Sequence, residues 1–188
     1  MRVYAELLLC SGSAAYMVRQ GFPALCLSVS VIAGCATASR SSDVLHLPGD
    51  DDQAAVSELA SFLGSAQLPV EKSPVGNSLF VYRRGMATLL SPVLQNDGLD
   101  RIIATRSYAP APGREDGDLV ELAFELNDQL NVGGFAVADG ALIYETNLTF
   151  VDRVSLDEIK RFLDWLDDVE LAIKSIDKER GVLLLTAT

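Results

Sequence analysis

Hydrophobic residues recur along the chain at two spacings, which predict helices and strands. Spacings of three and four residues predict helices over about 52–64, 118–130 and 156–178. Asp50, Asp51 and Asp52 are suited to the start of the first helix, and Asp116 or Asp118 to the cap of the second. The third has the pattern of a capping box, Ser155 followed by Glu158. Its apolar stripe comprises Leu156, Ile159, Leu163, Leu166, Val169, Ile173 and Ile176, widened by Phe162 and Trp165.

Short apolar segments, several of them alternating with polar residues, predict five strands. These cover residues 79–82, 86–94, 99–108, 134–138 and 141–150. Pro92 weakens the second strand or places it at a sheet edge. Turn signals at residues 96–98 and at Asp139 and Gly140 join neighbouring strands as antiparallel hairpins. In the last strand, one face is expected to pack against a helix, and it carries Leu142, Tyr144, Thr146, Leu148 and Phe150.

The predicted order of elements is α-β-β-β-α-β-β-α. This order defines an α+β fold, with an antiparallel sheet and helices packed on one of its faces. Residues 51–188 are expected to form this domain, with a loop over 65–77 and a short strand or packed tail over 182–185. Residues 35–50 contain many small and polar residues, and they are predicted to be a flexible tether.

The chain before the tether has the features of an export signal. Residues 22–34 are apolar or small and follow Arg19, and the run is shorter than the roughly 20 residues that span a bilayer. Its end, residues 32–35, reads Ile-Ala-Gly-Cys and resembles the lipobox of bacterial lipoproteins. We therefore expect residues 1–34 to be a lipoprotein signal peptide, with translation starting at Met17. Cys35 is then the lipidated first residue of the mature protein.

Two alternatives stay open for this segment. One is an uncleaved membrane anchor, and the other is ordinary signal cleavage after the Ala-Thr-Ala sequence at residues 36–38. Lipidation places the protein in the cell envelope. In a Gram-negative host, Ala36 after the cysteine favours the outer membrane, facing the periplasm.

Charge and cysteine content narrow the classes of partner. The net charge of −11 argues against nucleic acid, because phosphate binding needs a basic face. All three cysteines, Cys10, Cys26 and Cys35, lie near the N-terminus. The mature domain is therefore expected to contain no disulfide and no thiolate metal site.

The sequence offers few candidates for catalytic residues. The single histidine, His46, lies in the predicted tether, where a mobile base is not preorganised. Arg83 and Arg84 are expected in an exposed turn. Carboxylates on the last helix are expected mainly on its solvent side: Asp164, Asp167, Asp168 and Glu170. The sequence thus predicts no catalytic residue, cofactor or metal site, and a protein that is not an enzyme.

One part of the chain carries a family resemblance. A helix ending in Leu130 and Asn131 leads to residues 135–142 and an extended strand, and residues 154–158 then open a long last helix. In this order the chain resembles the YbjN family, whose fold is similar to that of type III secretion chaperones. The resemblance covers about residues 50–178 and is sharpest over 130–166. It implies a non-enzymatic, often dimeric domain that binds other proteins, in a family mostly described as cytoplasmic.

Together these features predict a lipid-anchored envelope protein whose domain binds a protein or peptide in a chaperone-like manner, without catalysis. The membrane is contacted through the lipid, and a homodimer is one arrangement that the family allows. Two alternatives stay open: an envelope hydrolase with a carboxylate-based site, and a structural envelope component that associates with itself.

Overall fold

The computed structural model describes residues 43–47, 49, 51–95 and 99–185, all within the compact unit Ser39–Thr188. Cys35, the predicted signal peptide and the turn at 96–98 lie outside the described residues. The helices are α1 (Asp52–Ser65), α2 (Asp116–Gln129) and α3 (Leu156–Asp177). The strands are β1 (Val44–Leu45), β2 (Val70–Lys72), β3 (Leu79–Arg83), β4 (Met86–Val93), β5 (Asp100–Tyr108), β6 (Gly134–Ala138), β7 (Ala141–Phe150) and β8 (Val154–Ser155).

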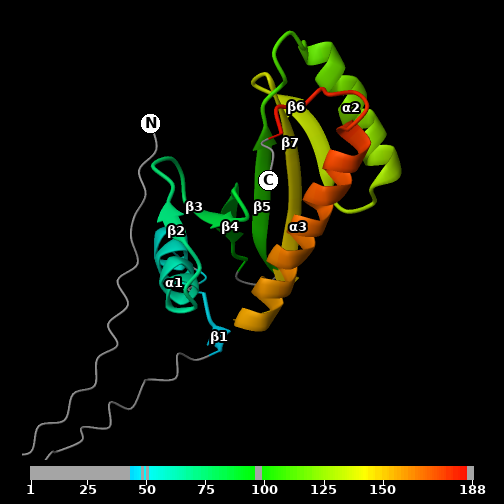
Figure 1. Cartoon of the computed structure of the whole chain (residues 1–188). Coiled ribbons are helices and arrows are strands. Elements are labelled where there is room, and N and C mark those ends of the chain that lie inside the picture. Colours follow the sequence, from blue (N-terminus) through cyan, green and yellow to red (C-terminus); the bar gives the residue numbers. More distant parts are fainter. Residues whose placement is uncertain (1–42, 48, 50, 96–98, 186–188) are drawn as a thin grey trace, which may run out of the picture. The chain divides into compact units, whose positions relative to one another are not determined.

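Six strands form one antiparallel sheet in the order β2-β3-β4-β5-β7-β6. The three helices pack against this sheet, with α1 beside β2 and β4 and with α2 beside β6 (Figure 1). β1 and β8 form a separate two-stranded ribbon. The predicted α+β fold is confirmed.

Three short strands, β1, β2 and β8, occur in segments for which no strand was predicted. β1 lies in the predicted tether, yet Leu45 is only 5% exposed and pairs with Val154 of β8. β2 lies in the predicted loop and pairs with β3. Segments of two or three residues are too short to show an alternating pattern, so their pairing depends on tertiary contacts.

Two tight turns set the register of the sheet. Asp139 and Gly140 both have positive φ, 51° and 69°, and they join β6 to β7 as the sequence predicted. Arg84 and Gly85, with φ of 47° and 77°, join β3 to β4 in the same way. This is the two-residue turn whose twist matches that of antiparallel strands.

Side chains cap the starts of the helices. Asp51 accepts hydrogen bonds from the backbone amides of Gln53 and Ala54 at the start of α1. Ser155 and Glu158 form the predicted capping box of α3. The cap of α2 is Glu115, so the predicted cap, Asp116 or Asp118, was wrong by one or three residues. Asp118 instead accepts a hydrogen bond from the backbone N–H of Glu115.

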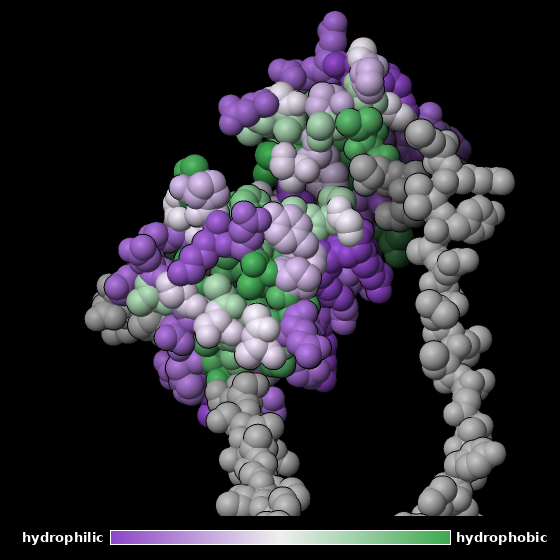
Figure 2. All heavy atoms as spheres, turned by 60° about the vertical axis from the view of Figure 1, so that its left-hand side comes forward, coloured by the Kyte–Doolittle hydropathy of each residue, from purple (hydrophilic) through white to green (hydrophobic). Residues whose placement is uncertain are grey.

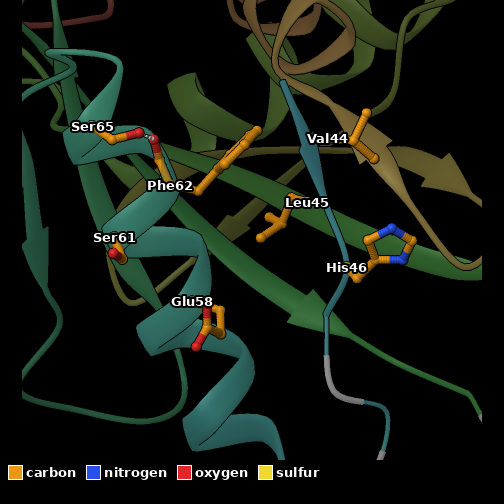
Figure 3. Close-up of a pocket in the computed structure, with 7 residues that line it drawn as sticks. All are labelled: Val44, Leu45, His46, Glu58, Ser61, Phe62 and Ser65. Atoms are coloured by element: carbon orange, nitrogen blue, oxygen red, sulfur yellow. Dashed lines mark hydrogen bonds between the residues drawn. The ribbon is translucent and has the colours of Figure 1, made fainter. Parts of the chain in front are cut away.

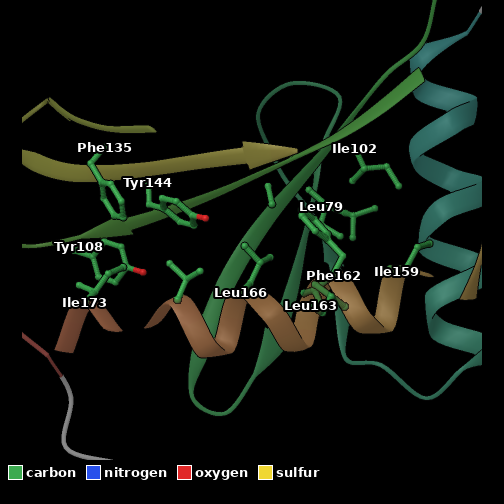
Figure 4. Packing of buried hydrophobic residues seen from close by; sticks show 14 of the residues in the cluster. Leu79, Ile102, Tyr108, Phe135, Tyr144, Ile159, Phe162, Leu163, Leu166 and Ile173 are labelled. Atoms are coloured by element: carbon green, nitrogen blue, oxygen red, sulfur yellow. The ribbon is translucent and has the colours of Figure 1, made fainter. Parts of the chain in front are cut away.

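α3 lies across the covered face of the sheet (Figure 4). Its apolar stripe faces even-numbered residues of β5 and β7, which share one face of the sheet because side chains alternate along a strand. Most of them are buried. The predicted stripe and the predicted buried face of β7 therefore meet. Residues of this contact include Ile102, Tyr108, Tyr144, Ile159, Phe162, Leu163, Leu166 and Ile173.

A buried arginine lies within this contact. Arg106 of β5 is 2% exposed, and its guanidinium donates hydrogen bonds to α3 and to β4. On α3 the acceptors are the Leu166 carbonyl at 2.8 Å and Asp167 Oδ1 at 3.0 Å. On β4 the acceptor is Thr88 Oγ1 at 2.9 Å. Arg106 thus connects the sheet to one turn of α3.

A second buried carboxylate extends these contacts. Glu170 is 5% exposed, and its Oε2 accepts a 2.6 Å hydrogen bond from the Tyr108 hydroxyl and lies 3.7 Å from Arg106 Nη1. Lys174 lies 3.6 Å from the other carboxylate oxygen. Burial and the neighbouring Glu170 charge raise the pKa of Tyr108 well above its usual value.

The hairpin between β3 and β4 contributes two arginines to the ion pairs around Asp167. Arg83 Nη2 lies 2.5 Å from Asp164 and 3.4 Å from Asp167, and Arg84 Nε lies 3.6 Å from Asp167. The predicted turn is confirmed, but only Arg84 is largely exposed, because the Arg83 side chain is 20% exposed and bonded within the chain. The hydrogen bond from Arg83 lowers the pKa of Asp164.

The carboxylates of α3 were expected mainly on its solvent side, and this is wrong for Asp167 and Glu170, which are buried. Asp167 follows Leu163 by four residues and Glu170 follows Leu166 by four, so both lie on the apolar stripe. Asp164 and Asp168 are exposed as predicted. The buried pair is tolerated because Arg106, Arg83 and Lys174 lie close to it.

Replacing Arg106 with leucine is expected to lower the free energy of unfolding by about 3–5 kcal/mol, because it leaves Asp167 and Glu170 buried without their central cation. Urea unfolding followed by circular dichroism measures this loss. The matched control is Arg161→Leu, which removes an exposed pair with Asp157 worth about 0.5 kcal/mol or less. A loss below about 1 kcal/mol for Arg106→Leu would contradict the account.

The raised pKa values of Tyr108 and Tyr144 predict loss of stability in alkali. Burial is the largest cause for both, and it raises the pKa of Tyr144 to about 12. Above pH about 10 these tyrosines ionise in the unfolded chain but not in the folded one, so the stability they maintain is present below pH 10 and is lost above it. Each contributes a slope of about 1.4 kcal/mol per pH unit in that range.

Tyr108→Phe is therefore expected to make the free energy of unfolding less dependent on pH between about pH 10 and 11.5, whatever its effect at neutral pH. Urea unfolding at several pH values measures the slope. Equal slopes for the wild type and Tyr108→Phe would show that Tyr108 ionises normally in the folded protein.

Candidate binding surface

The predicted lipid site, Cys35, lies outside the described residues, as do residues 1–34. Among the residues that are described, no helix combines the length and apolar character that a bilayer span needs. No group of three acidic, histidine or cysteine side chains in the same ranges is placed to hold a metal ion. The described residues of the α+β domain offer grooves and exposed side chains.

One groove lies between β1 and α1 and contains His46 (Figure 3). Its volume is about 340 Å³, and its α1 wall includes Glu58, Ser61 and Ser65. The imidazole of His46 projects away from α1 in this view, and the Ser65 hydroxyl donates to the Phe62 carbonyl at 2.7 Å. His46 thus belongs to an ordered segment rather than to a tether, but it is not directed at a serine nucleophile.

The buried carboxylates are engaged by partners of the same chain. Asp167 accepts from Arg106, and Glu170 accepts from Tyr108. Both lie between α3 and the sheet, and each also lies within 4 Å of a second cation. This arrangement fixes α3 and places neither carboxylate as an accessible acid or base.

Exposed apolar side chains are mostly scattered among polar ones, and Figure 2 shows such mixing on one side of the molecule. Val120 and Phe124 differ, because they are neighbours four residues apart on α2. Phe124 is 73% exposed and Val120 is 41% exposed. Both line a groove of about 190 Å³ between α2 and β6, together with Ala123, Asn127, Phe135, Ala136 and Val137.

β6 is an edge strand of the sheet, and Asn127 of α2 binds to it. The Asn127 side chain donates to the Phe135 carbonyl at 2.8 Å and accepts from the Phe135 amide at 2.9 Å. It thereby occupies both backbone groups of Phe135 in the way that a neighbouring strand would. Asn127 was not among the residues predicted from the sequence, because its contact depends on the position of β6 next to α2.

Gly133 lets the chain pass close to β7 at the start of β6. Its φ is 146°, and a Cβ at this position would lie 2.6 Å from the Glu145 carbonyl oxygen. The following strand is then held by the stacked rings of Phe135 and Tyr144, whose centroids are 4.7 Å apart. The Tyr144 hydroxyl donates to the Val132 carbonyl. The β6 wall of the groove is therefore held in place by contacts with Tyr144 in the core.

Comparison with known proteins supports the fold. The structure is similar to the crystal structure of YbjN from E. coli, described as a proposed transcription regulator. The TM-score is 0.50 at 12% sequence identity, and the match covers 70% of this chain and 96% of that one. No protein-family model and no curated protein sequence matches the chain. The expected YbjN-like fold is thus confirmed.

Asn127→Ala is expected to release the Phe135 backbone from α2. Loss of two partly buried hydrogen bonds lowers the free energy of unfolding by about 1–3 kcal/mol and speeds exchange of the Phe135 amide hydrogen. Gln129→Ala removes only an exposed hydrogen bond to Glu125 on the same helix and serves as the control with a smaller effect. If the Phe135 amide stays protected in Asn127→Ala, the proposed edge contact is not what protects it.

Proposed function

We propose that this chain is a lipid-anchored protein of the cell envelope whose α+β domain binds a segment of another protein, without catalysis. The observation that carries this proposal is the groove between α2 and β6, where Phe124 is 73% exposed. A large exposed aromatic beside a preformed apolar groove is typical of a protein-binding site. The Ile-Ala-Gly-Cys sequence ending at Cys35 supports the lipid anchor.

The charge of the protein favours a protein partner over nucleic acid. YbjN is described as a proposed transcription regulator, but this chain carries a net charge of −11. Direct contact with DNA phosphates needs a basic surface. A carboxylate-based hydrolase is the less favoured alternative, because Asp167 and Glu170 are bonded to Arg106 and Tyr108.

Site-specific photo-crosslinking tests the binding site in cells. Benzoylphenylalanine at position 124 is expected to form an adduct with a specific envelope protein. The matched control is position 171 on α3, where Leu171 is 60% exposed but lies outside the groove. No adduct at position 124, or the same adducts at both positions, would contradict the proposed site.

Metabolic labelling with radioactive palmitate tests the anchor. The full-length protein is expected to incorporate the label and to fractionate with membranes, because the thiol of Cys35 accepts the lipid. Cys35→Ala is expected to lose the label, whereas Cys26→Ala is the control within the signal peptide. Continued labelling of Cys35→Ala would rule out this cysteine as the lipid site.

A further inference from the structure

The exposed side of α2 has apolar residues in the middle and acidic residues at both ends. Asp116, Val120, Phe124 and Asp128 follow one another at intervals of four residues, so they form a row that winds slowly around the helix. Each step turns by about 40°, and Asp128 is therefore rotated by about 120° from Asp116. The two aspartates are about 18 Å apart along the axis, at 1.5 Å per residue. This row of four side chains is called the α2 ridge.

The two ends of the α2 ridge lie at the two ends of β6. A Cβ placed on Gly140, in the turn that follows β6, would lie 3.9 Å from Asp116 Oδ1. At the other end, Asp128 follows Asn127, which is bonded to Phe135 near the start of β6. Along the helix axis, the two carboxylates therefore lie on either side of the α2 residues that line the groove, Val120 to Asn127.

The carboxylates of the α2 ridge have no neutralising partner among the ion pairs of the described residues. α2 contains five acidic residues and no lysine or arginine. The other three are paired, Asp118 with Arg114 and both Glu121 and Glu125 with Arg180. Negative charge thus remains where the groove ends, next to its exposed apolar residues.

These charges disfavour a second copy of the chain as the occupant. A symmetric contact through this surface would bring two acidic α2 helices together, because the same patch faces itself in a two-fold dimer. Like charges in such a contact are repulsive. Strand addition along β6 is also restricted, because Asn127 already occupies the backbone of Phe135. Side chains of a different partner remain to fill the groove.

We infer that the groove between α2 and β6 binds a partner segment with apolar residues flanked on both sides by lysine or arginine. The apolar side chains pack on Val120 and Phe124, and the flanking cations pair with Asp116 and Asp128. This inference rests on the proposed function and specifies the chemistry of its partner. An extended segment spans 18 Å with about five or six residues, at roughly 3.3 Å each.

The probe is a fluorescein-labelled peptide of sequence Lys-Lys-Val-Thr-Phe-Thr-Val-Lys-Lys, and the matched control has glutamates in place of the lysines. Fluorescence anisotropy measures their binding to the full-length lipoprotein in nonionic detergent. The lysine peptide is expected to bind and the glutamate peptide not to bind. In Asp116→Asn/Asp128→Asn, binding of the lysine peptide is expected to weaken by about threefold to tenfold at low salt, which is typical for two exposed ion pairs.

The charge effect should disappear at about 0.5 M salt, because exposed ion pairs are screened. Phe124→Ser should abolish binding of the lysine peptide. The control Asp168→Asn/Glu179→Gln removes two exposed carboxylates elsewhere and should leave binding unchanged. Circular dichroism checks that each variant is folded.

Three results would overturn the inference: no binding of the lysine peptide, equal binding of both peptides, or unchanged binding in Asp116→Asn/Asp128→Asn. A wild-type dimer that Phe124→Ser dissociates would also overturn it and make a second copy the occupant. In the first three cases, a specific adduct at position 124 would still support the proposed function. The failures of the two proposals are therefore distinguishable.

Discussion

The guanidinium of Arg106 fixes where α3 lies on the sheet. A charge at this depth is costly unless every donor has a partner, and the partners come from both layers: Thr88 on β4, and Asp167 and the Leu166 carbonyl on α3. Apolar contacts along α3 contribute most of the stabilisation, but they tolerate sliding better than directional hydrogen bonds do. The arginine therefore determines the register of the helix, and the leucine and isoleucine contacts determine its affinity for the sheet.

A row of paired strand residues connects Arg106 to the groove between α2 and β6. Arg106 pairs with Tyr144 on β7, and Tyr144 pairs with Phe135 on β6, so the three residues lie in one line across the sheet. Asn127 of α2 then binds the backbone of Phe135. The wall of the groove is thus connected to the core through a continuous row of strand pairs, which keeps the groove formed in the absence of a partner. Preorganisation of this kind lowers the entropic cost of binding.

The sequence was sufficient to predict the main elements, because long periodic segments, the Ser155 capping box and the Asp139 turn are local signals. β1, β2 and β8 were missed, since the β1–β8 pairing joins distant residues and β2 is a three-residue strand whose pairing partner lies beyond a loop. Asp167 and Glu170 were misplaced because hydropathy assigns carboxylates to solvent, although their spacing from Leu163 and Leu166 puts them on the buried stripe. The Asn127 contact depends on the position of β6 next to α2, which no local pattern of the sequence reveals.

Hydrogen exchange of the protein, measured with and without the partner captured at position 124, tests the central claim most directly. Binding in the groove predicts slower exchange in α2 and at Val137 of β6, with no change in α3 or in the turn at Arg84 and Gly85. Slower exchange confined to α3, to that turn or to the β1–β8 ribbon would contradict the assignment of the groove between α2 and β6 as the binding site.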